Sequence, residues 1–420
     1  MKSTRPLDLL AVNAYWPGLA FLWNSLHLIV LPALLLEQVD PTRKNTALGL
    51  LTFAGLLLAT VVQPLSGAIS DGWTSRLGRR RPLIIIGTLF DFLFLGVIAV
   101  APNLMTLAVG YLGLQLSSNL AHGPLQGLMH DRVPPGQMGR ASGIKNLLDM
   151  SGLVASSLLV GRLLSPADPS PGGAVAAIAV VLLVGLLIVT LAVREAPAPA
   201  TAVPWTDRVR ASLRLDLRAT PAFWRLIAGR FVFLLSIYPI QAFAQYYVRD
   251  RLAAENPVKL TGDLMAAIVL SLMVFSLFGG YLCDRFGRRR MHVVAAVLVG
   301  VGALLMIPVR TPTAVLVYGS IVGAGIGVFL TANWALANDL APRGEAGKYL
   351  GLTNLATAGA GAISRLAGPI IDGLNLAVPG EYLGYAALFA GAAVLSSASL
   401  LALRRIPEDL GAASSEPSAP

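Results

Sequence analysis

The feature that most constrains this chain is a series of twelve apolar runs, each near the roughly 20 residues that an α-helix needs to cross a bilayer. Inside lipid every backbone N–H and C=O must be paired within the protein, so such runs predict helices. Of the 420 residues, 55% are hydrophobic and only 13% are charged. Gly319, Gly323 and Gly327 have the small-residue spacing that lets membrane helices pack closely. We therefore predict an all-α membrane protein with spans near 10–36, 47–70, 83–101, 104–130, 141–164, 173–193, 224–248, 262–283, 291–309, 313–338, 349–372 and 382–403.

Two motifs occur twice, about half a chain apart. The first is Gly67-Ala-Ile-Ser-Asp71 with Gly78-Arg79-Arg80-Arg81, repeated as Gly280-Tyr-Leu-Cys-Asp284 with Gly287-Arg288-Arg289-Arg290. The second is Asp131-x-x-Pro134 through Gly139, Arg140, Gly143 and Asn146, repeated as Asp339-x-x-Pro342 through Gly347, Lys348, Gly351 and Asn354 at a constant offset of 208. Each half carries six runs, so the chain is predicted to be a tandem duplication with the basic motif in a loop between two helices.

The duplication predicts four segments: a six-helix bundle over 1–193, a linker over 194–223, a second bundle over 224–405 and a disordered tail over 406–420. In the linker, Trp205, Val209, Leu213 and Leu217 recur every fourth residue beside a stripe of arginines. This pattern favours an amphipathic helix on an anionic membrane surface, with a solvated linker helix as the alternative. The tail is rich in Pro, Ser and Ala, a composition typical of disorder.

Loop charge predicts the orientation. With the amino terminus inside, the cytoplasmic segments hold 22 Lys and Arg and the outer ones seven, so both termini are predicted to be cytoplasmic in the cell (inner) membrane. This topological use of basic residues explains the net charge of +10 better than nucleic-acid binding does. The single cysteine excludes an internal disulfide and a cysteine-based metal site. No cofactor is expected, and we expect a monomer in contact with membrane lipids.

Six plus six helices with the doubled loop motif resemble the major facilitator superfamily of secondary transporters. The first loop, Ser70-Asp71-Gly-Trp-Thr-Ser-Arg76-Leu-Gly78-Arg-Arg-Arg-Pro82, and the segment Asn119-x-x-x-Gly123-Pro124-Leu-Gln126 are similar to those of the sucrose/proton symporters, a branch close to the glycoside–pentoside–hexuronide:cation symporters. Two departures matter. Gln126 stands where plant sucrose carriers have an arginine important for coupling. The apolar parts of the first two helices lack the carboxylates of sodium-coupled relatives, so sodium is disfavoured and a proton is the expected coupling ion.

The resemblance implies a cytoplasmic gate built from the repeated motifs. Asp71 would face the start of the eleventh helix near Lys348, because a carboxylate is stabilised at a helix amino terminus, and Asp284 would face the equivalent start near Arg140. Arg79 and Arg288 would pair with Asp131 and Asp339. The alternative is that the arginines only set topology. The predicted gate residues are Gly67, Asp71, Gly78, Arg79, Asp131, Arg140, Gly280, Asp284, Gly287, Arg288, Asp339 and Lys348.

A few ionisable residues fall within the spans, where each needs a partner, water or a function. Lys145 and Asp149 are four apart on one helix face and can form either a proton-responsive switch or a static pair. Asp91 is expected to make a hydrogen bond between helices. Arg365 can bind sugar hydroxyls or pair with Asp149. For Arg230, snorkelling to the interface and a buried role are equally favoured. Our coupling candidates are Asp149, Lys145, Arg365 and Asp91, with Asp149 preferred.

In this architecture helices one, four, seven and ten line the substrate cavity. Their polar and aromatic residues suit a neutral polyhydroxyl ligand, because amides donate and accept hydrogen bonds and an indole can stack on a sugar ring. Hydrogen bonding between helices is the alternative role for each, and neutral buried imidazoles are the default for the two histidines. The candidates are Trp23, Asn24, His27, Gln115, Asn119, His122, Gln126, Gln241, Gln245, Tyr246, Asn333, Trp334 and Asn338.

The sequence therefore predicts a proton-coupled importer of a sugar or glycoside that works by alternating access. Two alternatives stay open: a proton-driven exporter of drug-like or metabolite compounds, and a non-transporting membrane assembly factor with the transporter fold. No phosphate-binding loop, metal-ligand cluster or nucleophile constellation supports an enzyme.

Overall fold

The computed structural model describes residues 5–164, 170–193, 195, 221–252, 254–340 and 346–404, without the side chains of Pro135 and residues 346–352. The predicted linker helix and the predicted disordered tail lie outside these residues. The described residues contain no strand, which agrees with the predicted all-α class.

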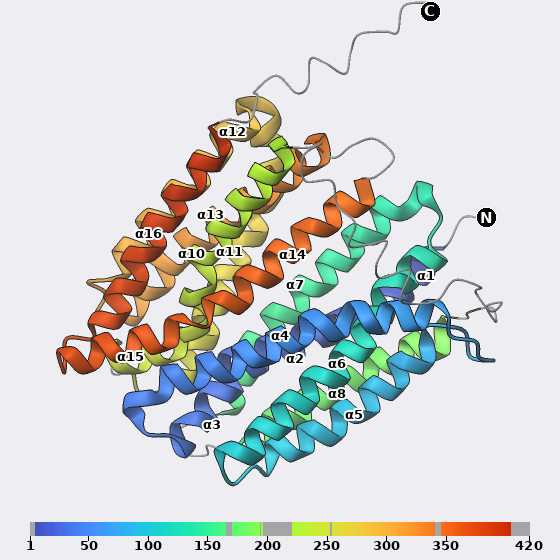
Figure 1. Ribbon diagram of the computed structural model, residues 1–420, viewed down its shortest axis with the longest axis horizontal. Coiled ribbons are helices and arrows are strands. Elements are labelled where there is room, and N and C mark those ends of the chain that lie inside the picture. The colour runs from blue at the N-terminus through green and yellow to red at the C-terminus, as the bar shows by residue number, and fades with distance from the viewer. Residues whose placement is uncertain are drawn as a thin grey trace, which may run out of the picture. The chain divides into compact units, whose positions relative to one another are not determined.

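The helices form two compact units, each shown in Figure 1. The first unit contains α1 (Pro6–Asn13), α2 (Trp16–Ser25), the π-helix η1 (Leu26–Val30), α3 (Leu31–Gln38), η2 (Pro41–Arg43), α4 (Lys44–Asp71), α5 (Arg81–Ala99), α6 (Leu104–Arg132), η3 (Pro135–Gln137), α7 (Met138–Leu163) and α8 (Gly172–Ala192), with the start of α11 up to Asp263. The second contains α10 (Pro221–Leu252), the rest of α11 (Pro257–Phe286), α12 (Arg288–Met306), α13 (Pro312–Leu340), α14 (Ala346–Ser364), α15 (Ala367–Ala377) and α16 (Leu383–Leu403).

The twelve predicted spans all correspond to helices. Within the described residues, nine helical stretches are long and apolar enough by themselves to cross a membrane. The other three spans are α6, α7 and α14 with α15, which carry many of the polar residues discussed below. Large apolar side chains such as Leu191 and Leu277 are 77% and 81% exposed, as expected for surfaces that face lipid.

The first predicted span is interrupted. It runs as α1, α2, η1 and α3, with a π turn in which the Leu31 N–H donates to the Leu26 carbonyl, five residues back. Pro32 follows directly, and proline lacks an N–H and crowds the carbonyl four residues earlier, which disturbs the regular helix. The π turn contains His27, one of the cavity candidates. Such turns occur frequently at functional sites.

Glycines allow close helix packing in both units. In the first unit, a Cβ on Gly123 of α6 would lie 2.1 Å from Ser66 Oγ of α4. In the second, a Cβ on Gly323 of α13 would lie 2.3 Å from the Ile268 carbonyl oxygen, and one on Gly327 would lie 2.4 Å from that of Leu272. The predicted small-residue packing stripe on α13 is therefore confirmed. Figure 1 shows α4, α5 and α6 side by side in the first unit, and α10 beside α16 in the second.

Candidate functional site

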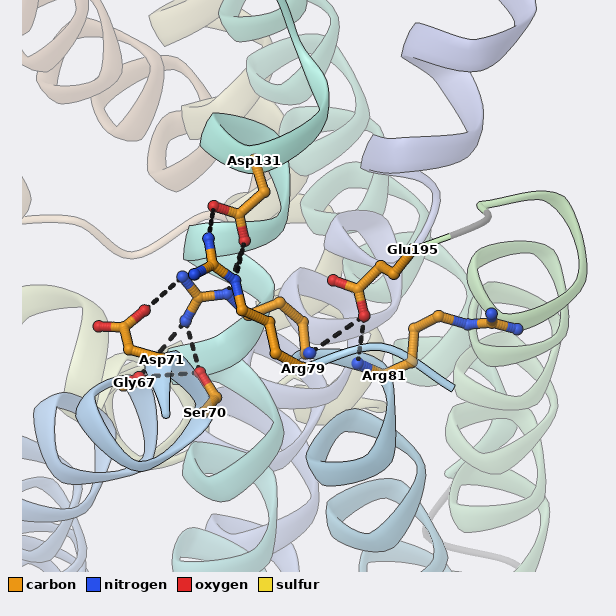
Figure 2. Close-up of polar contacts among 8 residues, drawn as sticks. Gly67, Ser70, Asp71, Arg79, Arg81, Asp131 and Glu195 are labelled. Atoms are coloured by element: carbon orange, nitrogen blue, oxygen red, sulfur yellow. Dashed lines mark hydrogen bonds and ion pairs between the residues drawn. The ribbon is translucent and has the colours of Figure 1, made fainter. Parts of the chain in front are cut away.

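The loop between α4 and α5 is held by arginines that converge on two carboxylates (Figure 2). Arg79 forms an ion pair with Asp131 at the end of α6 and donates from Nε to Asp131 Oδ2 at 3.0 Å. This hydrogen bonding to Asp131 is the main reason that the pKa of Arg79 is raised above its usual value. The pair expected from the sequence is present, and it ties the loop to α6.

Arg80 is the centre of this cluster, although the sequence analysis gave it no role. Its side chain is only 7% exposed, and it forms ion pairs with Asp71 and Asp131, the latter at 2.9 Å from Nε. It also donates to Ser70 Oγ at 2.5 Å and to the Gly67 carbonyl at 3.4 Å. Gly127 leaves room for it, because a Cβ there would lie 2.5 Å from Arg80 Cζ. Arg80 therefore joins the ends of α4 and α6.

Glu195 completes the loop cluster from beyond α8. Its Oε2 accepts the backbone N–H groups of Arg80 and Arg81 at 3.0 and 3.1 Å, at the amino terminus of α5 (Figure 2). A carboxylate at this position satisfies free N–H groups and complements the positive end of the helix. Gly78 has φ +96°, a left-handed conformation that glycine adopts without strain, and a Cβ there would lie 2.3 Å from Glu195.

The second copy of the motif is simpler. Gly287 again has a positive φ, +87°. Arg288 again forms an ion pair with an acid near the end of a long helix, here Asp339 of α13. Arg288 Nη1 also donates to the Ala335 carbonyl at 3.4 Å. Asp284 is exposed and forms no ion pair within the described part of the chain. The two copies are thus unequal, since only Asp71 is held by an arginine of its own loop.

The gate itself stays a prediction. The proposed contact of Asp71 with the helix start at Lys348, and that of Asp284 with Arg140, would each join the two units, and the side chain of Lys348 is not described. The structure adds a partner for Asp71 that we did not expect, Arg80. Gly67 and Gly280 have space around them: a Cβ on Gly67 would lie 3.8 Å from the Gly123 oxygen, and nothing lies within 4 Å of one on Gly280.

Lys145 and Asp149 form the expected pair on α7. Lys145 Nζ lies 2.7 Å from Asp149 Oδ2, and both side chains are about one quarter exposed, at 23% and 24%. Lys145 also lies 3.8 Å from the ring centroid of Trp16 on α2, in cation–π geometry. The ammonium is therefore held from two sides. Pairing of Asp149 with Arg365 would join the two units and stays a prediction.

Asp91 has the structural contact expected of it. It is fully buried on α5 and accepts a hydrogen bond from Ser117 Oγ on α6. A Cβ on Gly87, one turn away, would lie 2.6 Å from the Ser117 carbonyl oxygen, so the two helices cross closely here. Asp91 therefore links α5 to α6.

Arg230 does not snorkel, so of the two roles left open by the sequence the buried one is present. It is 8% exposed on α10, and its Nη1 donates to Asn333 Oδ1 of α13 at 2.7 Å. Its Nε and Nη2 donate to Thr357 Oγ1 of α14 at 3.2 and 3.1 Å. Inserting an arginine side chain at the centre of a membrane helix costs about 2.5–3.5 kcal/mol, and these polar partners inside the bundle offset part of that cost for Arg230. Arg365, just after α14, is also buried, with 9% exposure.

Several cavity candidates of the first unit form one hydrogen-bonded cluster. His27 Nε2 lies 2.9 Å from Tyr111 Oη, and Gln115 Nε2 donates to the same oxygen at 2.7 Å. Asn119 Nδ2 donates to Gln115 Oε1 at 3.1 Å, and Trp23 stacks on His27 with ring centroids 5.2 Å apart. A Cβ on Gly55 of α4 would lie 2.5 Å from Tyr111, so this glycine makes room for the ring that joins the cluster.

The other candidates differ in setting. Asn24 donates to Ser156 and Ser157 of α7 at 2.7 and 2.8 Å, so it links α2 to α7. His122 meets Trp16 edge to face at 5.2 Å between ring centroids. Gln245, Tyr246 and Asn333 are buried, Gln241 is half-buried, and Gln126, Trp334 and Asn338 are exposed. The structure thus brings together His27, Gln115 and Asn119 with Trp23, and separates the remaining candidates into other contacts.

Sequence reasoning missed Arg80, Glu195, Tyr111 and Thr357. Arg80 could not be distinguished from its neighbours, because three arginines stand in a row. Glu195 was placed in the linker, and no local pattern connects it with the start of α5, because it lies 115 residues from Arg80 in the sequence. Tyr111 lies one turn before Gln115 on the same helix face, a spacing that pattern analysis could have used. Within the described residues, no group of three or more His, Cys, Asp or Glu is arranged to hold a metal ion.

Comparison with known proteins agrees with this architecture. The family model described as Major Facilitator Superfamily matches residues 8–365 and, in a second match, 254–419. The MFS transporter asaE of Aspergillus flavus is 25% identical over 61% of this chain and 55% of its own length. The minor myo-inositol transporter IolF of Bacillus subtilis is 26% identical over 37% of this chain and 34% of its own length. The chain thus spans only about a third to a half of these relatives.

A shorter match is the human solute carrier family 2 facilitated glucose transporter member 12, 28% identical over 22% of this chain and 15% of its own length. Solved structures share the fold over nearly the whole chain. A D-xylose-proton symporter has a TM-score of 0.70 at 15% identity, covering 95% of this chain and 98% of its own. The nucleoside transporter NupG has a TM-score of 0.70 at 15% identity, covering 95% of this chain and 100% of its own.

Proposed function

This chain belongs to the Major Facilitator Superfamily, and we propose that it imports a sugar or glycoside together with protons by alternating access. Members of this superfamily are secondary transporters: integral, multi-pass membrane proteins that carry a small molecule across the membrane. The sugar, the proton, the inward direction, the cell-membrane location with cytoplasmic termini and the monomeric state are parts of the proposal.

The polar cluster of the first unit carries the sugar proposal. Trp23, His27, Gln115 and Asn119 place an indole, an imidazole and two amides together on helices that line the cavity in this superfamily. Amides can donate to and accept from hydroxyl groups, and the indole offers a flat apolar face to a sugar ring. Relatives whose names refer to myo-inositol and glucose transport support the same substrate class.

The pair on α7 supports proton coupling. Protonation of Asp149 would remove the charge that holds Lys145 Nζ, now 2.7 Å away, and leave the ammonium to the Trp16 ring. Such a pair links proton binding to a side-chain movement beside α2. Sodium is disfavoured because the first two spans lack intramembrane carboxylates.

The test is uptake into proteoliposomes that contain the purified protein. Sucrose, maltose and other glycosides are supplied with an imposed pH gradient, with and without a protonophore. We expect gradient-dependent uptake of at least one member. Asp149→Asn should abolish the gradient-driven part but keep counterflow, whereas Ser151→Ala, an exposed change on the same helix, should behave as the parent. Uptake that does not depend on the pH gradient would refute proton coupling. Absence of uptake for every sugar tested would favour the exporter or the assembly factor.

The gate is part of the same proposal. Asp71 and Asp284 would stabilise the state that is closed to the cytoplasm, and the arginine pairs would orient their loops. In a Cys283→Ser background, Gln126→Cys supplies a single thiol for an impermeant reagent applied from the cytoplasmic side. Asp71→Asn and Asp284→Asn should each increase labelling, whereas Asp8→Asn, at an exposed position in α1, should not. Unchanged labelling in both motif variants would refute the gate.

A further inference from the structure

Arg230 lies well inside the membrane part of the second unit. It is the tenth residue of α10, so at 1.5 Å per residue it stands about 14 Å from the start of that helix. Its partner Asn333 is seven residues before the end of α13. Both residues are nearly inaccessible, with exposures of 8% and 1%. A permanent positive charge is therefore held at depth in the bundle.

The described structure provides no counter-charge for this guanidinium. Its acceptors are the amide oxygen of Asn333 and the hydroxyl of Thr357, both neutral. The Thr357 hydroxyl donates its own hydrogen to the Thr353 carbonyl at 2.8 Å, so its lone pairs are turned toward Arg230. Of the acids on α10 and α13, Asp250 lies twenty residues further along its helix and Asp339 is paired with Arg288. The described α14 helix contains no acid.

Asn333 adds an unused donor at the same place. A guanidinium has only donors, so the amide must turn its oxygen toward Arg230, which directs its NH2 group away from that contact. That buried Nδ2 has no hydrogen-bond partner in the described structure. Buried donors are almost always satisfied, so a charged donor and an unpartnered donor side by side indicate a missing acceptor.

We propose that Arg230 and Asn333 bind an anionic group of the cargo, so that the transported compound is a polyhydroxyl compound that carries a carboxylate. This inference rests on the proposed sugar transport and narrows its substrate class. Arginine suits the task, because its planar group can give two parallel hydrogen bonds to a carboxylate. The unpartnered Asn333 N–H supplies a further donor, and Thr357 fixes the orientation of the guanidinium.

Equilibrium binding to the purified protein tests the proposal with glucose and gluconate, which share six carbons and differ in charge. The parent should bind gluconate at least about tenfold more tightly, the order expected for a charge-assisted hydrogen bond. Arg230→Gln should bring the two affinities close to equality. Asn333→Asp should also bring the two affinities close to equality, because the new carboxylate would form an ion pair with Arg230 and neutralise its charge. Ser236→Ala, a buried change on the same helix whose hydroxyl bonds only to the Phe233 carbonyl, is the matched control and should keep the preference.

The outcomes separate the two proposals. Equal binding of glucose and gluconate by the parent, or a preference that survives both variants, would overturn the anion site and leave sugar transport standing. A third outcome is that the parent binds lactate or inorganic phosphate but neither glucose nor gluconate, and that Arg230→Gln abolishes this binding. That result would support the anion site and overturn sugar transport. Absence of binding by every compound, in protein that melts cooperatively, would overturn both.

Discussion

Replacing Arg80 by glutamine should loosen the ends of α4 and α6 that meet at this loop far more than the same change at its neighbour Arg79. Both residues belong to one run of three arginines, and both contact Asp131. They differ in burial, because the Arg80 side chain is 7% exposed and that of Arg79 is 31% exposed. Arg80 also reaches Asp71, Ser70 and the Gly67 carbonyl.

The expected cost follows from these contacts. A hydrogen bond to a charged group contributes about 1.5–3 kcal/mol, and removing one partner of a buried ion pair costs more when the other charge is left buried and unpaired. Asp71 is already 39% exposed and Asp131 keeps Arg79, so neither carboxylate is left buried and unpaired. We therefore expect Arg80→Gln to cost about 2 kcal/mol of local stability, and Arg79→Gln about 0.5 kcal/mol after solvent screening.

Hydrogen–deuterium exchange can measure this difference in local stability at the helix ends that Arg80 contacts. Tenfold corresponds to about 1.4 kcal/mol, so the last turns of α4 and α6 should exchange about 30-fold faster in Arg80→Gln and about twofold faster in Arg79→Gln. Amides in α16, in the other unit, provide the internal reference and should not change. Equal acceleration by the two substitutions, or none by Arg80→Gln, would refute the assignment of Arg80 as the central residue.

Two further predictions concern packing and a third concerns the buried Asp91. Gly55→Ala should lower the melting temperature by several degrees, because its Cβ would lie 2.5 Å from Tyr111 and overpacking costs about 1–3 kcal/mol, while Gly96→Ala, with nothing within 4 Å, should not. Gly123→Ala should likewise destabilise more than Gly67→Ala, since its Cβ meets Ser66 and the Gln63 carbonyl, and equal melting curves would contradict this. Asp91→Asn should keep uptake near the parent level, because the amide oxygen can still accept from Ser117; complete loss of uptake would instead give Asp91 a role in coupling.

Much of the local chemistry could be predicted because it depends on spacing along the chain. Lys145 and Asp149 are four residues apart on a helix, which places them on one face, and they do pair. The repeat aligned Arg79 with Arg288 and Asp131 with Asp339, the resemblance to the superfamily implied that these residues pair, and both ion pairs are present. The expected hydrogen bond between Asp91 and a neighbouring helix, which Ser117 of α6 donates, is also confirmed.

Sequence alone could not decide the contacts of long side chains that have more than one environment within reach. Arg230 was as much expected to reach the interface as to be buried, and the contacts with Asn333 and Thr357 decide for burial, across more than a hundred residues of sequence. The partner of Asp71 was expected in the other half, yet Arg80 of its own loop lies against it. The two copies of the motif also differ, which their shared residues do not reveal.

The sequence alone determined that the chain crosses the membrane as helices in two related halves, because hydropathy over about 20 residues and the positions of basic loops are local properties. Tertiary structure alone decided which of three consecutive arginines is buried, because that depends on the space left by Gly127 and on Asp131, about fifty residues away. It also placed Glu195 on the start of α5 and Asn333 beside Arg230. Such polar contacts depend on where helices cross, and helix crossings are set by the packing of the whole unit.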